Sequence, residues 1–249
     1  ILLRSIIQSR SNKYEIIVSD NSDNNTEILN FIDDLNSTKI KYYHQEGFLS
    51  MSDNFDKGVE KAIGKYVIIL GDDDGILVDE SVDFLENCYG QDIQAIYPMA
   101  INYQWPDNSH SIWGSLGGTI NISRKSTFMK QLDIPKELKK QSNYGFGLGL
   151  GKLPRVYHGF VLNKCCQELK AKCGTAFPGP SPDMANAVGL STFLKKSFVT
   201  NKFLVISGHS NKSAAGMGGR KEHIGEINNI PALPKNTSNL WSNKIPFFW

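Results

Sequence analysis

In the stretch KYVIILGDDDGIL, residues 65–77, four apolar residues are followed by three consecutive aspartates that have a glycine on either side. Apolar runs of this length beside turn residues predict a buried strand, which here ends at Asp72, Asp73 and Asp74. Neighbouring carboxylates disfavour each other's ionisation, so the cluster costs stability unless a cation or a hydrogen-bond donor lies beside it. The stretch therefore predicts a strand end that serves a purpose beyond the fold.

The sequence around this stretch alternates between strand and helix patterns. Strand-like runs occupy 15–18, 40–44, 66–70 and 93–99, and apolar residues at helical spacing mark the segments between them. This alternation predicts βαβ units and a mainly parallel central sheet with helices on both faces. Ligands bind outside the carboxyl ends of such strands, where Asp20 and the three aspartates both fall.

Beyond residue 100 the pattern becomes less regular. It predicts turns and irregular strands, and then helices near 124–132, from 160 to about 172, and from Ser181-Pro182-Asp183 onward, and a strand over 198–207. We therefore predict one α/β domain in two halves, followed by a basic tail. The proposed boundaries are 1–100, 101–215 and 216–249.

The composition is that of a globular protein, with 249 residues of which 40% are hydrophobic and 21% charged. No apolar run reaches the length of a transmembrane helix. The four cysteines form no C-x-x-C pair, which favours reduced thiols packed as small apolar side chains. The chain begins Ile-Leu-Leu-Arg, without an initiator Met or a signal-peptide pattern, so we expect a fragment that lacks its original start.

The charge is unevenly distributed along the chain. Residues 184–249 hold eight Lys or Arg and two Glu, a net charge of +6, whereas residues 1–183 carry −4. A basic tail can close over a bound polyphosphate or lie on an anionic membrane, and a simply solvated tail explains the same charge.

The aspartate cluster allows three interpretations. A structural turn would use the carboxylates to cap a nearby helix. A phosphatase similar to the haloacid dehalogenase class would use Asp72 as nucleophile and Asp74 as acid or base, but that class needs a downstream acidic pair, and no Asp follows Asp183. A D-x-D site would hold Mg²⁺ or Mn²⁺ through hard oxygen ligands and neutralise the diphosphate of a nucleotide donor.

Two longer segments favour the third interpretation. YEIIVSDNSDNNT (14–26) and GVEKAIGKYVIILGDDD (58–74) resemble, in this order, segments of family-2 glycosyltransferases with the A-type nucleotide-diphospho-sugar transferase fold. The resemblance covers roughly residues 1–100 and implies a single Rossmann-like domain with an irregular acceptor-side half. It further implies an inverting glycosyltransferase of the hexosyltransferase type that uses Mn²⁺ or Mg²⁺. The family's first strand has no counterpart in this chain.

The resemblance assigns donor-side roles residue by residue. Asp20 would hydrogen-bond the nucleobase, usually uracil, and Asp73 would contact the ribose or the donor sugar. Asp74 would ligate the metal, and Asp72 would complete the triplet. Asn54 stands where some subfamilies keep an Asn near the donor, although the Arg-Asn pair of other members is absent.

Two segments of the second half resemble subfamily patterns. GPSPDMANAVGLS (179–191) resembles an "sPD" segment, which implies that Asp183 deprotonates the acceptor hydroxyl; taken alone, Asp183 could simply complement the helix dipole after an N-cap at Ser181. VISGHSNKS (205–213) resembles "isGhSpkS", which implies His209 as a second metal ligand. Lys212 and Arg220 would then close over the diphosphate.

The family resemblance also suggests partners. The donor would be UDP-linked, and the acceptor a saccharide or lipid-linked intermediate of bacterial surface-polysaccharide or glycolipid synthesis. Such a protein would be cytoplasmic, with possible contact to the inner membrane face through the basic tail and no nucleic-acid partner. A catalytically silent nucleotide-sugar-fold binding module is the alternative from a different functional class. His158, in RVYHGFVLNK (155–164), is more typical of a packed histidine than of an acceptor-site residue.

Overall fold

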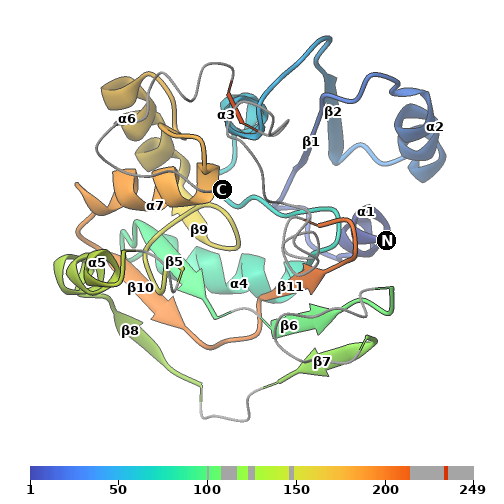
Figure 1. Cartoon of the computed structure of the whole chain (residues 1–249). Helices are drawn as coiled ribbons and strands as arrows, with labels where there is room; N and C mark the ends of the chain where they lie inside the picture. Colours follow the sequence, from blue (N-terminus) through green and yellow to red (C-terminus); the bar gives the residue numbers. More distant parts are fainter. Residues whose placement is uncertain (100, 108–116, 123–126, 146–148, 214–232, 235–249) are drawn as a thin grey trace.

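The computed structural model describes residues 1–99, 101–107, 117–122, 127–145, 149–213 and 233–234 (Figure 1). Its helices are α1 (Leu2–Ile7), α2 (Thr26–Leu35), α3 (Met51–Lys61), α4 (Val78–Tyr89), α5 (Ile134–Asn143), α6 (Asn163–Cys173) and α7 (Pro182–Ser191). Its strands are β1 (Ile16–Asp20), β2 (Ile40–His44), β3 (Tyr66–Val67), β4 (Gly75–Ile76), β5 (Ala95–Pro98), β6 (Ile101–Gln104), β7 (Thr119–Asn121), β8 (Met129–Gln131), β9 (Phe160–Leu162), β10 (Ser197–Thr200) and β11 (Val205–His209).

The strands form three sheets, and the α/β class predicted from the sequence is confirmed. Strands β1 and β2 pair in parallel; the second sheet has the order β3-β9-β5-β10-β8, and the third has the order β4-β11-β6-β7. The prediction of a mainly parallel sheet is wrong, because only β5–β10 and β6–β11 are parallel in the two larger sheets. Strand β9, from the second half of the chain, lies between β3 and β5 and is antiparallel to both. A βαβ crossover would have made neighbouring strands parallel, and none connects β9 to these two strands.

The second half departs from the predicted elements at two places. The described end of the helix expected near 124–132 is strand β8, which pairs with β10, and the helix follows it as α5. Its N-cap is Asp133, whose carboxylate accepts a hydrogen bond from the amide of Lys136. The strand expected over 198–207 is split into β10 and β11, which belong to different sheets.

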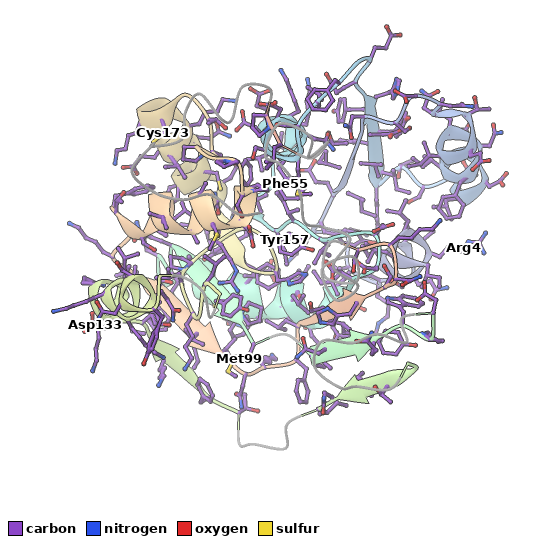
Figure 2. The ribbon with its side chains drawn as sticks, viewed as in Figure 1. Arg4, Phe55, Met99, Asp133, Tyr157 and Cys173 are labelled. Carbon is purple, nitrogen blue, oxygen red and sulfur yellow. The ribbon has the colours of Figure 1, made fainter. Side chains whose placement is uncertain are left out.

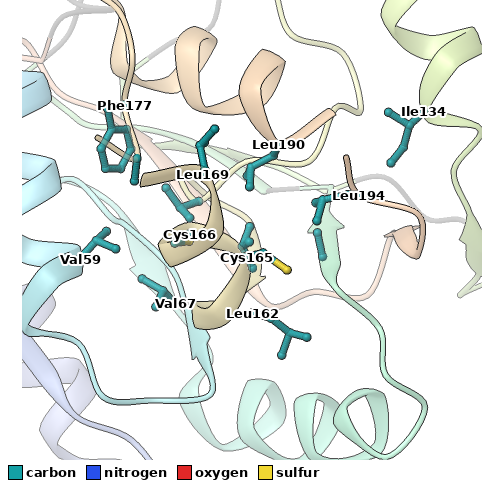
Figure 3. Packing of buried hydrophobic residues seen from close by; sticks show 14 residues of the cluster. Val59, Val67, Ile134, Leu162, Cys165, Cys166, Leu169, Phe177, Leu190 and Leu194 are labelled. Carbon is teal, nitrogen blue, oxygen red and sulfur yellow. The ribbon is translucent and has the colours of Figure 1, made fainter. Parts of the chain in front are cut away.

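Helices cover both faces of the five-stranded sheet, as predicted. Val161 and Ala95 face a core formed with α3, α6 and α7, whereas their neighbours Phe160 and Ile96 face a core formed with α4. This alternation follows from the two-residue period of side chains along a strand. Figure 3 shows the first core, in which Cys165 and Cys166 pack among leucines beside Phe177.

The cysteines are free thiols, and Cys88, Cys165 and Cys166 are buried while Cys173 is exposed. Burial raises the pKa of Cys88 and of Cys165 to about 11, and that of Cys166 to about 12. These thiols therefore stay protonated and act as small apolar side chains, as the sequence predicts. In the part of the chain that the structure describes, no helix has the length and apolar character to cross a membrane.

Candidate active site

The three aspartates lie in the turn between β3 and β4, and their side chains have different environments. Asp72 is exposed, Asp73 is half-buried and Asp74 is buried. The amide of Asp74 donates to the carbonyl of Gly71 at 3.3 Å, which closes the turn. Consecutive residues in a tight turn point in different directions, so the three carboxylates cannot share one environment.

Asp74 points into the protein, where both of its oxygens accept hydrogen bonds. Oδ1 accepts from the backbone amide of Gly208 at 2.9 Å, and Oδ2 accepts from the backbone amide of Gly71 at 2.6 Å. Oδ2 also lies 2.7 Å from Nε2 of His158, and the side chain of Asp74 is only 1% exposed. A carboxylate this deeply buried needs such donors, because an unpaired buried charge is very costly.

Asp73 connects the same turn to two other elements. Its Oδ2 accepts from the amide of Ser210 at 2.9 Å, just beyond β11, and its carbonyl accepts from Nε1 of Trp105 at 2.9 Å, just beyond β6. A Cβ on Gly208 would lie 1.7 Å from that carbonyl oxygen, so only glycine permits this approach. Asp72 makes no hydrogen bond or ion pair with the described residues.

The aromatic side chain of Tyr157 lies beside the turn, next to Gly71. Tyr157 lies between Phe55, whose ring is stacked 6.2 Å away, and His158, whose ring lies 4.2 Å away. Figure 2 shows Phe55 and Tyr157 near the centre of the molecule. Burial, followed by the negative charges of Asp74, Asp73 and Asp183, raises the pKa of Tyr157 far above its ordinary value. Its neutral phenol therefore lies within electrostatic reach of both the aspartate turn and Asp183.

Asp183 lies in the first turn of α7, as predicted. Its Oδ1 accepts from the hydroxyl of Ser181 and from the amide of Met184, both at 2.9 Å. Ser181 is at the N-cap position, but its hydroxyl donates to Asp183 and makes no capping bond to the helix. Oδ2 of Asp183 accepts no hydrogen bond from the residues that the structure describes. Its role as base stays a prediction.

Asp20 and Asn54 lie at the other acidic strand end, that of β1. Oδ2 of Asp20 accepts from the hydroxyl of Tyr42 at 2.7 Å, and Oδ1 accepts from the amide of Ser22 at 2.9 Å. Partial burial raises the pKa of Asp20, but these hydrogen bonds outweigh it and hold the pKa below its ordinary value. Asp20 is therefore an oriented, ionised acceptor at physiological pH.

Asn54 projects from α3 onto the loop after β1. Its amide nitrogen donates to the carbonyl of Ser19 at 3.3 Å and to Oδ1 of Asn21 at 3.2 Å, and its oxygen accepts from the hydroxyl of Ser19 at 2.7 Å. Its polar atoms are thus used to order the loop that carries Asp20. The donor-binding role given to Asn54 stays a prediction.

The C-terminal candidates are described only in part. His209 ends β11, and its Nε2 lies 3.4 Å from Oδ1 of Asn102 on β6. Lys212 is exposed in the turn that follows, two residues after the Ser210 amide that binds Asp73. Arg220 and most of the basic tail lie outside the described residues. The roles given to these three residues stay predictions.

A divalent cation fits this site only in part. Among the described residues, no three His, Cys, Asp or Glu side chains are grouped so that they could hold an ion. Mg²⁺ needs only one or two carboxylates when substrate phosphates supply the other ligands, so the turn can still contribute. Asp74 does not fit an open ligand position, because both of its oxygens already accept hydrogen bonds. Its assignment as the metal ligand stays a prediction; Asp72 and Oδ1 of Asp73, by contrast, accept no hydrogen bond from the residues that the structure describes.

Sequence analysis missed how Tyr157, His158 and Gly208 take part in this site. His158 was interpreted as a packed histidine, which is correct, but its partner is an aspartate 84 positions away in the chain. The one local signal was a polar His between apolar runs, and that signal does not identify a partner.

Comparison with known proteins supports a nucleotide-sugar transferase fold. The family model described as Glycosyl transferase family 2 matches residues 1–106. The crystal structure of residues 1–349 of S. aureus TarS in complex with UDP-GlcNAc is similar, with 12% sequence identity and a TM-score of 0.59. That alignment covers 86% of this chain and 55% of the TarS chain.

Two further S. aureus TarS structures, each 12% identical, give the same picture. The structure of residues 1–349 has a TM-score of 0.57 over 83% of this chain and 55% of that one, and the structure titled simply TarS has 0.51 over 85% and 34%. At this identity the likeness establishes the fold, and this chain spans about half the length of the two shorter TarS chains and about a third of the longer one. No curated protein sequence matches the chain.

Proposed function

Residues 1–106 belong to glycosyltransferase family 2, and on that premise we propose that the chain transfers a sugar from a nucleotide-diphospho donor to an acceptor hydroxyl. We further propose a UDP-linked donor and inversion at the anomeric carbon. The observation that carries the proposal is that Tyr157, beside the aspartate turn, also lies within electrostatic reach of Asp183, while a second acidic strand end stands at Asp20. Carboxyl ends of strands are the usual ligand edge of open α/β sheets.

The donor would bind across the two strand ends. Asp20, held ionised and oriented by Tyr42, would accept a hydrogen bond from the N–H of the nucleobase. Asp73 would contact the ribose or the donor sugar, and Lys212 and Arg220 would contribute positive charge near the diphosphate. When bound, a divalent cation would neutralise the diphosphate so that it can leave. Exposed Asp72 and Oδ1 of Asp73 are the carboxylate oxygens best placed to hold it.

The transfer step would use Asp183 as general base. The acceptor hydroxyl oxygen attacks the anomeric carbon as its proton passes to Asp183, and the bond from that carbon to the diphosphate breaks with its electron pair going to the nucleoside diphosphate. Asp183 suits this task because its Oδ1 is held by Ser181 and Met184 in the first turn of α7, while its Oδ2 has no hydrogen-bond donor among the described residues. Neutral Tyr157 adds no charge to the site and can donate a hydrogen bond within it.

The acceptor and location are proposed from the family resemblance alone. A saccharide or lipid-linked intermediate of bacterial surface-polysaccharide or glycolipid synthesis would suit the family. Work at the inner membrane face would follow if the basic tail contacts anionic lipid.

The decisive experiment screens UDP-, GDP- and TDP-sugars with Mn²⁺ and measures release of the nucleotide. Asp183→Asn should lower transfer by about 10²–10⁴-fold while UDP and Mn²⁺ affinities stay nearly unchanged, because only proton transfer is lost. Asp83→Asn, an exposed position on α4, is the matched control for charge and should leave the rate unchanged. A large loss of UDP binding in Asp183→Asn would show that the base is misplaced. A wild-type protein that neither binds UDP nor responds to metal would refute the transferase.

A further inference from the structure

We propose that Asp74 is a positioning residue, and that with groups that donate hydrogen bonds to it Asp74 forms a clamp that orients the neighbouring carboxylates toward the nucleotide sugar. The clamp consists of Asp74, the amides of Gly71 and Gly208, and the imidazole of His158. The proposal rests on the proposed function for its purpose, but its central test needs neither donor nor metal.

The first argument is the environment of the carboxylate. The side chain of Asp74 is 1% exposed and accepts hydrogen bonds from two backbone amides and from Nε2 of His158, and the phenol of Tyr157 lies beside it as a further donor. Hydrogen bonds to an ionised acceptor are about twice as strong as neutral ones. To ligate a cation, Asp74 would have to give up at least part of this set, whereas Asp72 would give up nothing.

The second argument is that the clamp joins three separate parts of the chain. Gly71 belongs to the turn after β3, Gly208 belongs to β11, and His158 lies in the segment that leads into β9. The bonds from Gly208 and His158 span 134 and 84 positions. The clamp thereby fixes the position of the end of β11. It therefore also positions Ser210, whose amide binds Asp73, and the neighbouring residues His209 and Lys212.

The third argument is the backbone of His158. Its φ is +59°, in the left-handed region that non-glycine residues seldom adopt, and its amide donates to the carbonyl of Ile69 at 3.1 Å. Residues keep such conformations where the surrounding structure requires them, often at functional sites. Here the conformation presents the imidazole to Asp74 while Tyr157 stacks on Phe55.

The consequence concerns the other two carboxylates. With Asp74 turned inward, Asp72 is left exposed and Asp73 keeps Oδ1 unbonded to any described residue, so these oxygens face a ligand. The inward orientation of Asp74 thus fixes the orientation of Asp72 and Asp73.

The test compares charge-neutralising variants in metal-free protein, by thermal unfolding with EDTA. If Asp74 were an open ligand, Asp74→Asn would relieve repulsion within the cluster, and Tm would stay level or rise. A clamp predicts a fall of at least about 5 °C, because the amide nitrogen faces a donor and a buried hydrogen bond is lost. Asp72→Asn, the same charge change two positions away, should leave Tm within about 2 °C.

His158 provides a second pair of variants in case Asp74→Asn does not fold. His158→Asn tolerates a positive φ but is too short to reach Asp74, so Tm should fall as in Asp74→Asn. His158→Gln places an N–H near the position of Nε2 and should recover part of the loss. Wild-type Tm in Asp74→Asn or His158→Asn would overturn the proposal.

Mn²⁺ binding in the absence of donor provides an independent measurement by titration. Asp72→Asn should weaken Mn²⁺ binding by about tenfold or more. The proposal fails if Asp72→Asn binds Mn²⁺ like wild type while a folded Asp74→Asn loses it. A chain that shows the Tm pattern but binds no nucleotide sugar would retain the clamp and refute the proposed function alone.

Discussion

Gly208→Ala adds a single methyl group, and the structure predicts that this small change lowers the stability of the protein strongly. The added methyl group would lie 1.7 Å from the carbonyl oxygen of Asp73 and 3.0 Å from Nε1 of Trp105. Real Cβ contacts begin near 3.0 Å, so the turn and β11 would have to separate by about 1.3 Å. This separation would stretch the hydrogen bond from the backbone amide of Gly208 to Oδ1 of Asp74, which is 2.9 Å long.

The magnitude follows from two contributions. Overpacking of a rigid site costs about 1–3 kcal/mol, and losing a hydrogen bond to a buried charged group costs about 1.5–3 kcal/mol. Together they amount to about 4 kcal/mol, which in a chain of this size lowers Tm by about 8–16 °C. The donor site should weaken as well, because Ser210 moves with Gly208.

Thermal and urea unfolding of Gly208→Ala measure this loss directly. Gly90→Ala is the matched control, since Gly90 is exposed at the end of α4 with φ −61°, and its nearest neighbours would be 3.8 Å from a Cβ. That control should be neutral or stabilise by about 0.4–1 kcal/mol. A Gly208→Ala protein within about 1 kcal/mol of wild type would refute the packing of the aspartate turn on β11.

Two further predictions concern the two ends of β1, Glu15 just before the strand and the loop that carries Asp20. Burial opposes ionisation of Glu15, but Lys41 and the amides of Ile63 and Gly64 together lower its pKa below the ordinary 4.5. Ionised Glu15 therefore stabilises the folded protein above pH 4.5, and this contribution is lost as the pH falls through the lower pKa of the folded state. Glu15→Gln should therefore be less stable than wild type in urea at pH 7, with the difference shrinking below pH 4.5; a difference independent of pH would contradict this. Asn54→Ala removes the three hydrogen bonds that order the loop carrying Asp20, so UDP affinity measured by calorimetry should fall about tenfold, whereas the exposed control Asn30→Ala on α2 should bind normally. Equal UDP affinity in the two variants would show that this loop does not hold the donor.

The elements of the first hundred residues were predictable because local patterns decide them. The strand-like runs at 15–18 and 40–44 and the helical spacing between them correspond to β1, β2 and α2. The second half was less predictable, because long-range pairing outweighs local propensity there. Met129–Gln131 is a strand since β10 lies beside it, and the run from Phe160 begins as β9 because β3 and β5 provide its partners.

The sequence by itself determined the α/β class, the acidic strand ends at Asp20 and Asp72–Asp74, and the helix that begins at Pro182. Each is a local pattern, and the order of two such patterns carries the family resemblance. Only the tertiary structure decided which of three adjacent aspartates faces inward. That choice depends on His158 and Gly208, whose distance along the chain from Asp74 leaves no local trace. Identical side chains next to one another acquire different roles because a turn points them in different directions, and only the folded chain determines what each one meets.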